Sequence, residues 1–408
     1  MLRSRTRRDI VIIGQQPWDT EIGSNCKDIA LEMSKKNRVL YVNSPLDRAT
    51  LIRNRNDEKV RTRIDVLKGR KNGLIRINDN LWNLYPDCML ESINWINIEY
   101  IFDSINKTNN RKFANAIQGA IDEIKFQGYI LFNDSEMFKG FYLNEFLNPA
   151  LSIYYSRDYM LAVDYWKKHG ERIEPLLIAK NDICMANSPY LTDYCKKYNP
   201  NSFYIGQGCD LELFEEIQDP PADLKKLGRP LIGYVGALQS IRLDIDLLAG
   251  IASARPDWNI VLVGPEDDVF KASVLHEFEN VIFTGLKPLS ELPACIQAFD
   301  VCINPQLVNE VTIGNYPRKI DEYLAVGKPV VATKTRAMDI FKDHVYLAEN
   351  LPGYLQHIQT ALDEDDAQKS LDRKEFAKLH TWENCVKEIY KILDSVHSTH
   401  LEYNYDFD

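Results

Sequence analysis

The sequence predicts an α/β protein with two doubly wound parallel-sheet domains. Three observations predict this fold class. The chain has 408 residues, more than a single hydrophobic core ordinarily holds. Short β-branched runs alternate with helical patterns, which is typical of parallel strands joined by crossover helices. The second half of the chain repeats this layout with cleaner spacing.

The first half contains seven β-branched runs that predict strands. They are residues 9–14, 38–43, 81–86, 129–133, 152–155, 183–186 and 202–205. Helical periodicity lies between them, for example at residues 25–36 and 111–125.

The second half contains six such runs, and a helical pattern follows each of the first four. The predicted strands are residues 231–235, 259–263, 280–283, 301–304, 329–333 and 344–347. The predicted helices are residues 244–254, 269–277, 289–299 and 318–326. Both halves are therefore expected to be Rossmann-like, with ligands at the carboxyl ends of their strands.

Composition changes indicate where the domains end. We expect a first domain at residues 1–207 and a second at 208–371, with a linker-like stretch at 215–230 that is charged and rich in proline. A terminal helix at 372–396 is expected to pack back on the first domain, and the tail 397–408 to be flexible.

Composition also bears on the compartment. No run of 18 apolar residues occurs, so no transmembrane helix is expected, and no apolar stretch after the basic start predicts a signal peptide. The eight cysteines form no CxxC pair and several lie in apolar runs, as expected for small buried side chains in a reducing compartment. We therefore predict a cytoplasmic protein.

The charge is unevenly distributed. The formal net charge is −10, which argues against nonspecific nucleic-acid binding. Residues 48–76, however, contain ten basic and three acidic residues, a local charge of +7 against −17 elsewhere. Such a run is either a solvated face or a docking site for an anionic membrane or a polyprenyl-linked diphosphate.

The most informative segment is NYPRKIDEYLAVGKPVVAT, residues 315–333. Pro317 suits the start of a helix, and Gly327 suits its left-handed exit. Lys319 and the free amides of the first helical turn can hold a phosphate, and Glu322, almost one turn later, can accept ribose hydroxyls. The alternative is a surface Lys–Glu pair on an ordinary crossover helix.

This segment resembles the donor-binding signature of GT-B glycosyltransferases, especially the retaining family-4 type. In that signature, EAxAxGxPVV, a Glu five residues before the Gly contacts the nucleotide ribose, and Glu322 and Gly327 have that spacing. Residues 9–45 resemble the first βαβ unit of the branch that includes teichuronic-acid-type glycosyltransferases. Further resemblance lies in YYSRDYM, ANSPYL, GQGCDLELF, RPLIGYVGAL, NIVLVGP, NVIFTGLKPLSELPACIQAFDVCINP and HTWENCVKEIYKIL.

The resemblance implies a GT-B architecture whose first domain binds the acceptor and whose second binds the donor, with the active site in the cleft between them. The donor would be a nucleoside-diphosphate sugar, with no further cofactor and no metal. The acceptor would be a glycan or a lipid-linked glycan, and transfer would retain the anomeric configuration. The expected setting is bacterial surface polysaccharide or glycoconjugate assembly, with the enzyme peripheral on the inner face of the membrane.

The resemblance also implies site residues. Gly236 would admit the diphosphate to the backbone, and Arg242 would lie near the phosphates unless it pairs with Asp244 or Asp246. The expected catalytic residues are Asp158, Arg242 and Lys319. The expected nucleotide-sugar-binding residues are Gly236, Gly264, Leu286, Thr312, Asn315, Lys319 and Glu322.

One position departs from the family pattern. Many family-4 enzymes place another Glu eight residues before the ribose Glu, where it contacts the donor sugar, but this chain has Gly314 there. The polar neighbours Glu310, Thr312 and Asn315 are candidate replacements. The donor sugar therefore cannot be carried over from the family.

Other acidic and histidine candidates have ordinary explanations. Asp244-Ile-Asp246 is formally a metal-binding DxD, but it begins a predicted helix, where acidic residues complement the helix dipole. The acidic run 266–268 also suits a helix start. His169 is expected at the surface, so no histidine base is evident in the first domain.

Polar residues after the strands of the first domain are the remaining candidates there. Arg157 could partner Asp158, and Trp18, Asp19 and residues 23–25 lie after the first strand. The motifs GxxxxGK, GxSxG and HExxH are absent. A noncatalytic nucleotide-sugar-binding or scaffold subunit and a nucleotide-sugar epimerase of the same fold remain open alternatives.

Overall fold

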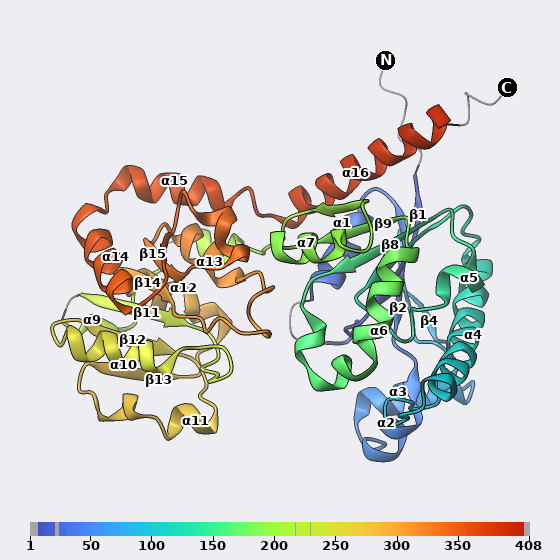
Figure 1. Cartoon of the computed structure of the whole chain (residues 1–408), viewed down its shortest axis with the longest axis horizontal. Helices are drawn as coiled ribbons and strands as arrows, with labels where there is room; N and C mark the ends of the chain where they lie inside the picture. The colour runs from blue at the N-terminus through green and yellow to red at the C-terminus, as the bar shows by residue number, and fades with distance from the viewer. Residues whose placement is uncertain (1–6, 21–23, 217, 229, 404–408) are drawn as a thin grey trace. The chain divides into compact units, whose positions relative to one another are not determined.

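The computed structural model describes residues 7–20, 24–216, 218–228 and 230–403. The chain divides into two compact units. Unit 1 comprises residues 1–187, 191–205 and 386–408, and unit 2 comprises residues 188–190 and 206–385. Each unit is an α/β layer structure around its own sheet, as the sequence predicts (Figure 1).

Unit 1 contains an eight-stranded sheet in the order β10-β9-β8-β7-β1-β2-β5-β4. Its pairings are parallel except β4 with β5. The strands are β1 (Asp9–Gly14), β2 (Arg38–Asn43), β4 (Leu74–Arg76), β5 (Leu81–Leu84), β7 (Ile130–Asp134), β8 (Leu151–Ser156), β9 (Ile183–Ala186) and β10 (Ser202–Tyr204). A small parallel pair adds β3 (Leu46–Asp47) and β6 (Met89–Leu90).

Helices cover this sheet. They are α1 (Asn25–Ser34), α2 (Arg48–Arg53), α3 (Glu58–Leu67), α4 (Glu99–Ile124), α5 (Leu143–Leu147), the 3-10 turn Met160–Ala162, α6 (Asp164–Lys180) and α7 (Pro189–Lys196). One core cluster joins α4 and α5 to β1, β2 and β7, and another joins α6 and α7 to β8 and β9.

The start of α4 differs from the prediction. The helix begins at Glu99 and not at residue 111, because two asparagines with low helix propensity are used in tertiary hydrogen bonds. Asn109 Nδ2 donates to the Glu91 carbonyl (2.9 Å), and Asn110 Nδ2 donates to the Phe138 carbonyl (2.9 Å). These contacts stabilise a stretch that periodicity alone does not mark as helical.

Unit 2 contains a six-stranded parallel sheet in the order β13-β12-β11-β14-β15-β16. Its register pairs Ile232 with both Ile260 and Val301, so β11 lies at the centre between β12 and β14. The strands are β11 (Leu231–Val235), β12 (Asn259–Val263), β13 (Val281–Gly285), β14 (Val301–Asn304), β15 (Val330–Thr333) and β16 (Tyr346–Ala348).

Helices cover both faces of this sheet (Figure 1). One face carries α8 (Glu212–Glu215), α9 (Ala222–Lys225), α12 (Leu292–Ala298), α13 (Arg318–Val326) and α15 (Ala367–Ala377). The other carries α10 (Ile245–Ala254), α11 (Asp268–Lys271), the 3-10 turn Val274–Glu277 and α14 (Leu351–Glu364). Further 3-10 turns lie at Leu289–Glu291 and Arg336–Phe341.

Several predicted elements are corrected. The single helix expected at 269–277 is the short α11 followed by a 3-10 turn. The linker-like stretch 215–230 includes α9, whose Leu224 is buried in the core. The long helix expected at 372–396 is two helices, α15 and α16 (Trp382–Tyr403). They are separated because Thr381 Oγ1 accepts from the Asn384 amide (3.2 Å) and starts a new helix.

The tail 397–408 was expected to be flexible, but helix α16 continues through it to Tyr403. Residues 404–408 lie outside the described part. In unit 1 helix α16 is tied to the sheet by two polar contacts. Asn37 Nδ2 donates to Tyr390 Oη (2.6 Å), and Arg8 pairs with Asp394 (2.6 Å). Within the described ranges, no helix combines the length and apolar composition that a membrane span requires.

Candidate functional site

The centre of the second sheet is a topological switch point. The chain leaves β11 toward β12 on one side, and β14 lies on the other side of β11. In open parallel sheets, ligands bind at such a point, beyond the carboxyl ends of the strands. Bridges join Leu238 to Glu266 and Leu243 to Gln306, so the loops after β11, β12 and β14 meet there.

Two glycines shape this edge. Gly236 (φ +139°) and Gly264 (φ +150°) both have left-handed backbone that disfavours other residues. A Cβ on Gly264 would lie 2.0 Å from the Gly236 carbonyl oxygen, and a Cβ on Gly236 would lie 3.1 Å from Lys319 Nζ. The absence of side chains therefore leaves a backbone surface that a ligand can approach closely, with the lysine ammonium beside it.

Lys319 lies in the first turn of α13 and is held in place. Its Nζ donates to Tyr234 Oη (2.5 Å) and lies 4.3 Å from the centroid of the Tyr234 ring. The predicted boundaries of this helix are confirmed, because it begins after Pro317 and ends at Gly327 (φ +88°). The free amides of the first turn and the ammonium together favour an anion.

Glu322 follows one turn later on α13. Its carboxylate is half-buried, and no hydrogen bond or ion pair reaches it from the described residues. Burial raises the pKa of Glu322, and the nearby charges of Arg318 and Lys319 oppose the rise. A half-buried acceptor without a partner is the group expected to receive ligand hydroxyls.

Arg318 was not singled out from the sequence. Its Nε is buried without a hydrogen-bond partner among the described residues, at the start of the helix that carries Lys319. Its position beside Lys319 was the available signal. Arg318 adds a second cation at the amino end of α13.

The opposite side of α13 is fixed by a buried polar cluster. Asp321 is fully buried, and its carboxylate contacts His380 Nδ1 (2.6 Å) and accepts a contact from Cys209 Sγ (3.3 Å). Tyr316 Oη lies 3.4 Å from the same His380 nitrogen. These contacts hold α13 through the buried Asp321, next to the half-buried Glu322.

The loop after β14 holds the residues expected near the donor sugar. Thr312 is buried, and its hydroxyl is used within the loop, accepting from the Asn309 amide (3.1 Å). The side chain of Asn315 is half-buried. Leu286 lies after β13, two strands away from β11, and is 76% exposed.

Arg242 belongs to the loop after β11. Its backbone carbonyl accepts from the Leu307 amide (2.8 Å), which joins this loop to the one after β14. The guanidinium is exposed and forms no ion pair with a described residue, so the alternative pairing with Asp244 or Asp246 is not present in the described structure.

The acidic candidates of unit 2 cap helices. Asp244 accepts from the Leu247 amide (2.8 Å) at the start of α10. Asp267 accepts from the Phe270 amide (2.8 Å) and from the Ser240 amide (2.7 Å), and these bonds lower the pKa of Asp267. No group of three or more His, Cys, Asp or Glu in the described ranges could hold a metal ion.

Unit 1 carries its own polar cluster at the carboxyl ends of β1, β7 and β8. Arg157 pairs with the buried Asp134 (2.8 Å) and with Asp158 (2.8 Å), and donates to Gln15 Oε1 (2.7 Å). Burial alone would lower the pKa of Arg157, but the two carboxylates raise it. Asp158 is 43% exposed, whereas Asp134, which the sequence did not single out, is inaccessible.

The remaining unit 1 candidates have structural partners. Asp19 pairs with Arg63 (3.1 Å), and Trp18 packs edge-on against Tyr41 at 5.1 Å. The prediction of a surface His169 is wrong: it is buried and stacks on Phe102 at 3.9 Å, because α6 turns this position toward the core. Residues 21–23, including Gly23, lie outside the described part.

Comparison with known proteins bears directly on the second unit. Residues 229–364 match the family model Glycosyl transferases group 1, and they contain Gly236, Gly264, Lys319 and Glu322. This segment is a glycosyl transferase group 1 domain. Its boundaries enclose the whole six-stranded sheet, so the switch point lies within the matched segment.

Curated relatives match a part of the chain. TuaH of Bacillus subtilis strain 168, named as a teichuronic acid biosynthesis glycosyltransferase, is 31% identical over 134 residues, which are 32% of this chain and 33% of that protein. The 2-deoxystreptamine glucosyltransferase of Streptomyces kanamyceticus is 28% identical over 134 residues, 29% of this chain and 33% of that protein. The matches thus span about a third of each relative.

Solved structures match over nearly the whole chain. The sucrose-phosphate synthase of Thermosynechococcus elongatus has a TM-score of 0.65 at 14% identity and covers 96% of this chain and 100% of its own. Anabaena HepE, in complex with UDP, has a TM-score of 0.63 at 16% identity and covers 95% and 100%. The chain therefore has the GT-B fold of these proteins, with two Rossmann-like units.

Proposed function

We propose that the protein is a glycosyltransferase that moves a sugar from a nucleoside-diphosphate sugar to a glycan or lipid-linked acceptor. One observation carries the proposal: in a glycosyl transferase group 1 domain, the ammonium of Lys319 lies against the bare backbone of Gly236, at the amino end of α13 and one turn before the unpartnered Glu322. This arrangement offers complementary groups for a diphosphate and for a ribose.

The diphosphate would lie over Gly236 and Gly264, beside Lys319 and the first amides of α13. Negative charge grows on the diphosphate as its bond to the sugar breaks, so fixed positive groups stabilise the transition state more than the ground state. Arg242 would add an exposed cation, and Arg318 a half-buried one. These groups would supply the stabilisation that a metal ion supplies in other transferases. We therefore propose that transfer requires no metal ion.

Glu322 would accept the ribose hydroxyls. Thr312 would act indirectly, by shaping the loop that its hydroxyl cross-links, while Asn315 and Leu286 would contact the nucleotide sugar. Asp158, which Arg157 fixes at the end of β8, would serve in catalysis from unit 1. Retention of configuration rests on the family resemblance of the Glu322 segment.

The acceptor and setting are supported by the relatives. TuaH is named for teichuronic acid biosynthesis, and UDP and UDP-glucose accompany HepE in solved structures. We accordingly propose a role in surface polysaccharide or glycoconjugate assembly. A cytoplasmic position on the inner membrane face is supported by five exposed basic side chains that form no ion pair with described residues: Arg53, Arg55, Lys59, Arg61 and Lys68.

A thermal-shift screen tests the donor assignment. The protein is mixed separately with UDP-, GDP-, ADP-, CMP- and dTDP-linked sugars. A ligand at 100 times its dissociation constant adds about 2.7 kcal/mol of stability, so the matching nucleotide should raise the melting temperature clearly. No shift with any of them would contradict the proposal. A shift without sugar release would favour the scaffold alternative, and isomerisation of the donor without an acceptor would favour an epimerase.

A further inference from the structure

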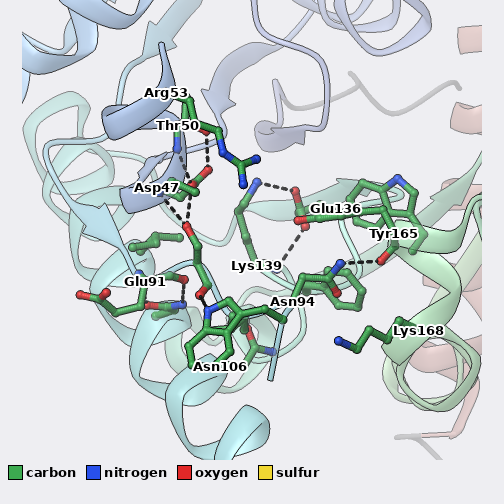
Figure 2. A pocket seen from close by; sticks show the side chains of 18 residues that line it. Asp47, Thr50, Arg53, Glu91, Asn94, Asn106, Glu136, Lys139, Tyr165 and Lys168 are labelled. Carbon is green, nitrogen blue, oxygen red and sulfur yellow. Dashed lines mark hydrogen bonds and ion pairs between the residues drawn. The ribbon is translucent and has the colours of Figure 1, made fainter. Parts of the chain in front are cut away.

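Unit 1 contains a pocket of about 530 Å³ that the proposed donor site does not use. This volume lies within the range of roughly 300–1,000 Å³ that is typical of small-ligand sites. Five segments form it: α2 with the residue before it, the loop after β6, the first half of α4, the turn after β7 and the start of α6. Figure 2 shows the side chains of Arg53, Lys139 and Glu136 directed toward one another.

Two of the carboxylates that line this pocket are already engaged by the protein. Asp47 accepts from the Thr50 amide (3.0 Å) and from Ser92 Oγ (2.7 Å). Glu91 forms two hydrogen bonds with the Arg48 guanidinium (2.8 and 2.7 Å). Neither carboxylate is therefore left to bind a cation.

The third carboxylate, Glu136, is 1% exposed and bonds to Lys139, whose Nζ lies 3.3 Å away and also donates to Ser44 Oγ (3.1 Å). Two further cations, Arg53 and Lys168, line the pocket and form no hydrogen bond or ion pair with a described residue. Figure 2 shows the Arg53 guanidinium directed toward the Lys139 ammonium. Arg53 and Lys168 thus lack a counter-charge among the described residues, which favours an anionic ligand.

Other lining groups suit a ligand with hydroxyls and a ring. Asn94 Nδ2 donates to the Tyr165 carbonyl (3.0 Å), but its buried Oδ1 has no partner among the described residues. Such an acceptor is expected to receive a donor, for example a hydroxyl. Trp95 is 74% exposed, yet its indole N–H donates to the Ser92 carbonyl (2.8 Å), which fixes the ring at the pocket. A fixed aromatic face offers contact area at little entropic cost.

We propose that this pocket binds a saccharide that carries a carboxylate or phosphate group. Lys139, Arg53 and Lys168 hold the anionic group, the Asn94 carbonyl oxygen accepts a sugar hydroxyl, and Trp95 covers the ring. Use of the pocket for the acceptor of transfer rests on the proposed function, whereas saccharide binding does not.

The test is a calorimetric titration of the full chain with four probes: glucuronic acid, glucose 1-phosphate, glucose and inorganic phosphate. The anionic sugars should bind about tenfold or more tightly than glucose, because charge-assisted hydrogen bonds are added, and more tightly than inorganic phosphate, which lacks the ring. The relative affinities of the first two probes identify the anionic group. Equal affinity for glucose and the anionic sugars, or no binding of any sugar, would overturn the proposal.

Adjacent lysines provide a matched pair of variants. Lys168→Met should weaken anionic sugars by roughly tenfold. Lys167→Met should have no effect, because Lys167 does not line the pocket and lies 4.0 Å from Glu171. Arg53→Ser should resemble Lys168→Met. The exposed residues Arg53 and Lys168 are chosen for substitution and Lys139 is not, because Lys139→Met would leave Glu136 buried and unpaired and so destabilise the fold.

Nucleotide binding is measured on the same samples to separate the two proposals. If Lys168→Met and Lys167→Met bound anionic sugars with equal affinity while nucleotide binding stayed intact, the pocket assignment alone would be overturned. Binding of anionic sugars without binding of any nucleotide sugar would instead overturn the proposed transferase function and leave the pocket assignment standing.

Discussion

The Lys319 ammonium is hydrogen-bonded to Tyr234 Oη at 2.5 Å and also lies 4.3 Å from the centroid of the same ring. Tyr234 is on the central strand β11 and Lys319 on the first turn of α13, so the two elements that flank the switch point are joined through one contact. Tyr234 contacts the lysine through a hydroxyl and an aromatic ring and not through a carboxylate, so it orients the ammonium without forming an ion pair with it.

Mutation of the two residues in this contact distinguishes electrostatic stabilisation by Lys319 from positioning by Tyr234. Lys319→Ala should lower kcat/KM by about two orders of magnitude, as for a lost electrostatic stabiliser, and Arg242→Ala should act in the same direction. Tyr234→Phe keeps the ring but removes the hydroxyl, so it should cost only roughly two- to tenfold. Steady-state kinetics with the matched donor measures all three. A larger loss in Tyr234→Phe than in Lys319→Ala would contradict the positioning role.

Glu322→Gln should weaken nucleotide-sugar binding by roughly 1–3 kcal/mol, since hydrogen bonds to a charged group are lost. The raised pKa of Glu322 adds a pH dependence: protonation sets in at higher pH than for an ordinary glutamate, so wild-type affinity should fall as the pH is lowered from neutral into the acidic range. The diphosphate diester of a nucleotide sugar does not titrate over this range. Calorimetry at several pH values should show that the affinity of Glu322→Gln does not change with pH. If the affinities of wild type and variant changed in parallel with pH, the assignment would be refuted.

The same shift has a consequence for stability. A carboxyl whose pKa is raised by folding contributes stability below its unfolded pKa, and this contribution is lost as the pH rises through the folded pKa. At neutral pH the Glu322 carboxylate therefore lowers stability, and Glu322→Gln should unfold at an equal or higher temperature than wild type. A clear fall in melting temperature would show that the side chain has a structural role instead.

Gly264→Ala should both destabilise the protein and disrupt the site. Its Cβ would lie 2.0 Å from the Gly236 carbonyl oxygen, and its φ of +150° is unfavourable for alanine. A cost of about 1–3 kcal/mol for the backbone strain, plus the clash, is expected in urea unfolding. Gly285→Ala is the control, because its φ of +69° is also left-handed but no atom lies within 4 Å of the added Cβ. Equal losses of unfolding free energy in Gly264→Ala and Gly285→Ala would mean that the backbone shifts to relieve the clash at little cost.

The basic segment predicts salt-sensitive binding to anionic liposomes. Each basic residue near such a surface contributes about 1 kcal/mol, so four contacts suffice for reversible docking. Arg55, Lys59, Arg61 and Lys68 are exposed and form no ion pair with described residues, and replacing all four with Ser should abolish co-sedimentation. The control is Arg63→Ser, because Arg63 is 12% exposed and pairs with Asp19. Equal recovery with neutral and anionic liposomes would leave the segment as an ordinary solvated face.

The sequence predicted the fold class and the main strands because these depend on local patterns. Buried parallel strands such as β11 and β12 are continuous β-branched runs, and α13 has proline before its start and glycine at its end. The strands β3, β4 and β6 were missed because two or three residues carry no periodicity. His169 was misplaced because its charged neighbours suggested exposure, whereas α6 turns it inward against Phe102.

Parts of the candidate site follow from local motifs, and others depend on tertiary structure. Gly236, Lys319 and Glu322 stand at recognisable positions, and the structure brings Gly236, Gly264 and Lys319 together. The contact of Lys319 with Tyr234 joins residues 85 positions apart, so no local spacing reveals it. The pocket of unit 1 was not foreseen for the same reason, since its lining runs from Asp47 to Lys168.

The most direct test of the account is donor hydrolysis in the absence of any acceptor. The nucleotide sugar that gives the largest thermal shift is incubated with wild type and with Lys319→Ala in excess EDTA, and free sugar is quantified. We expect slow release by wild type, undiminished by EDTA and about 100-fold slower in the variant. No release above the buffer rate by wild type, or release that requires a divalent ion, would contradict a metal-free glycosyltransferase site at Gly236, Lys319 and Glu322.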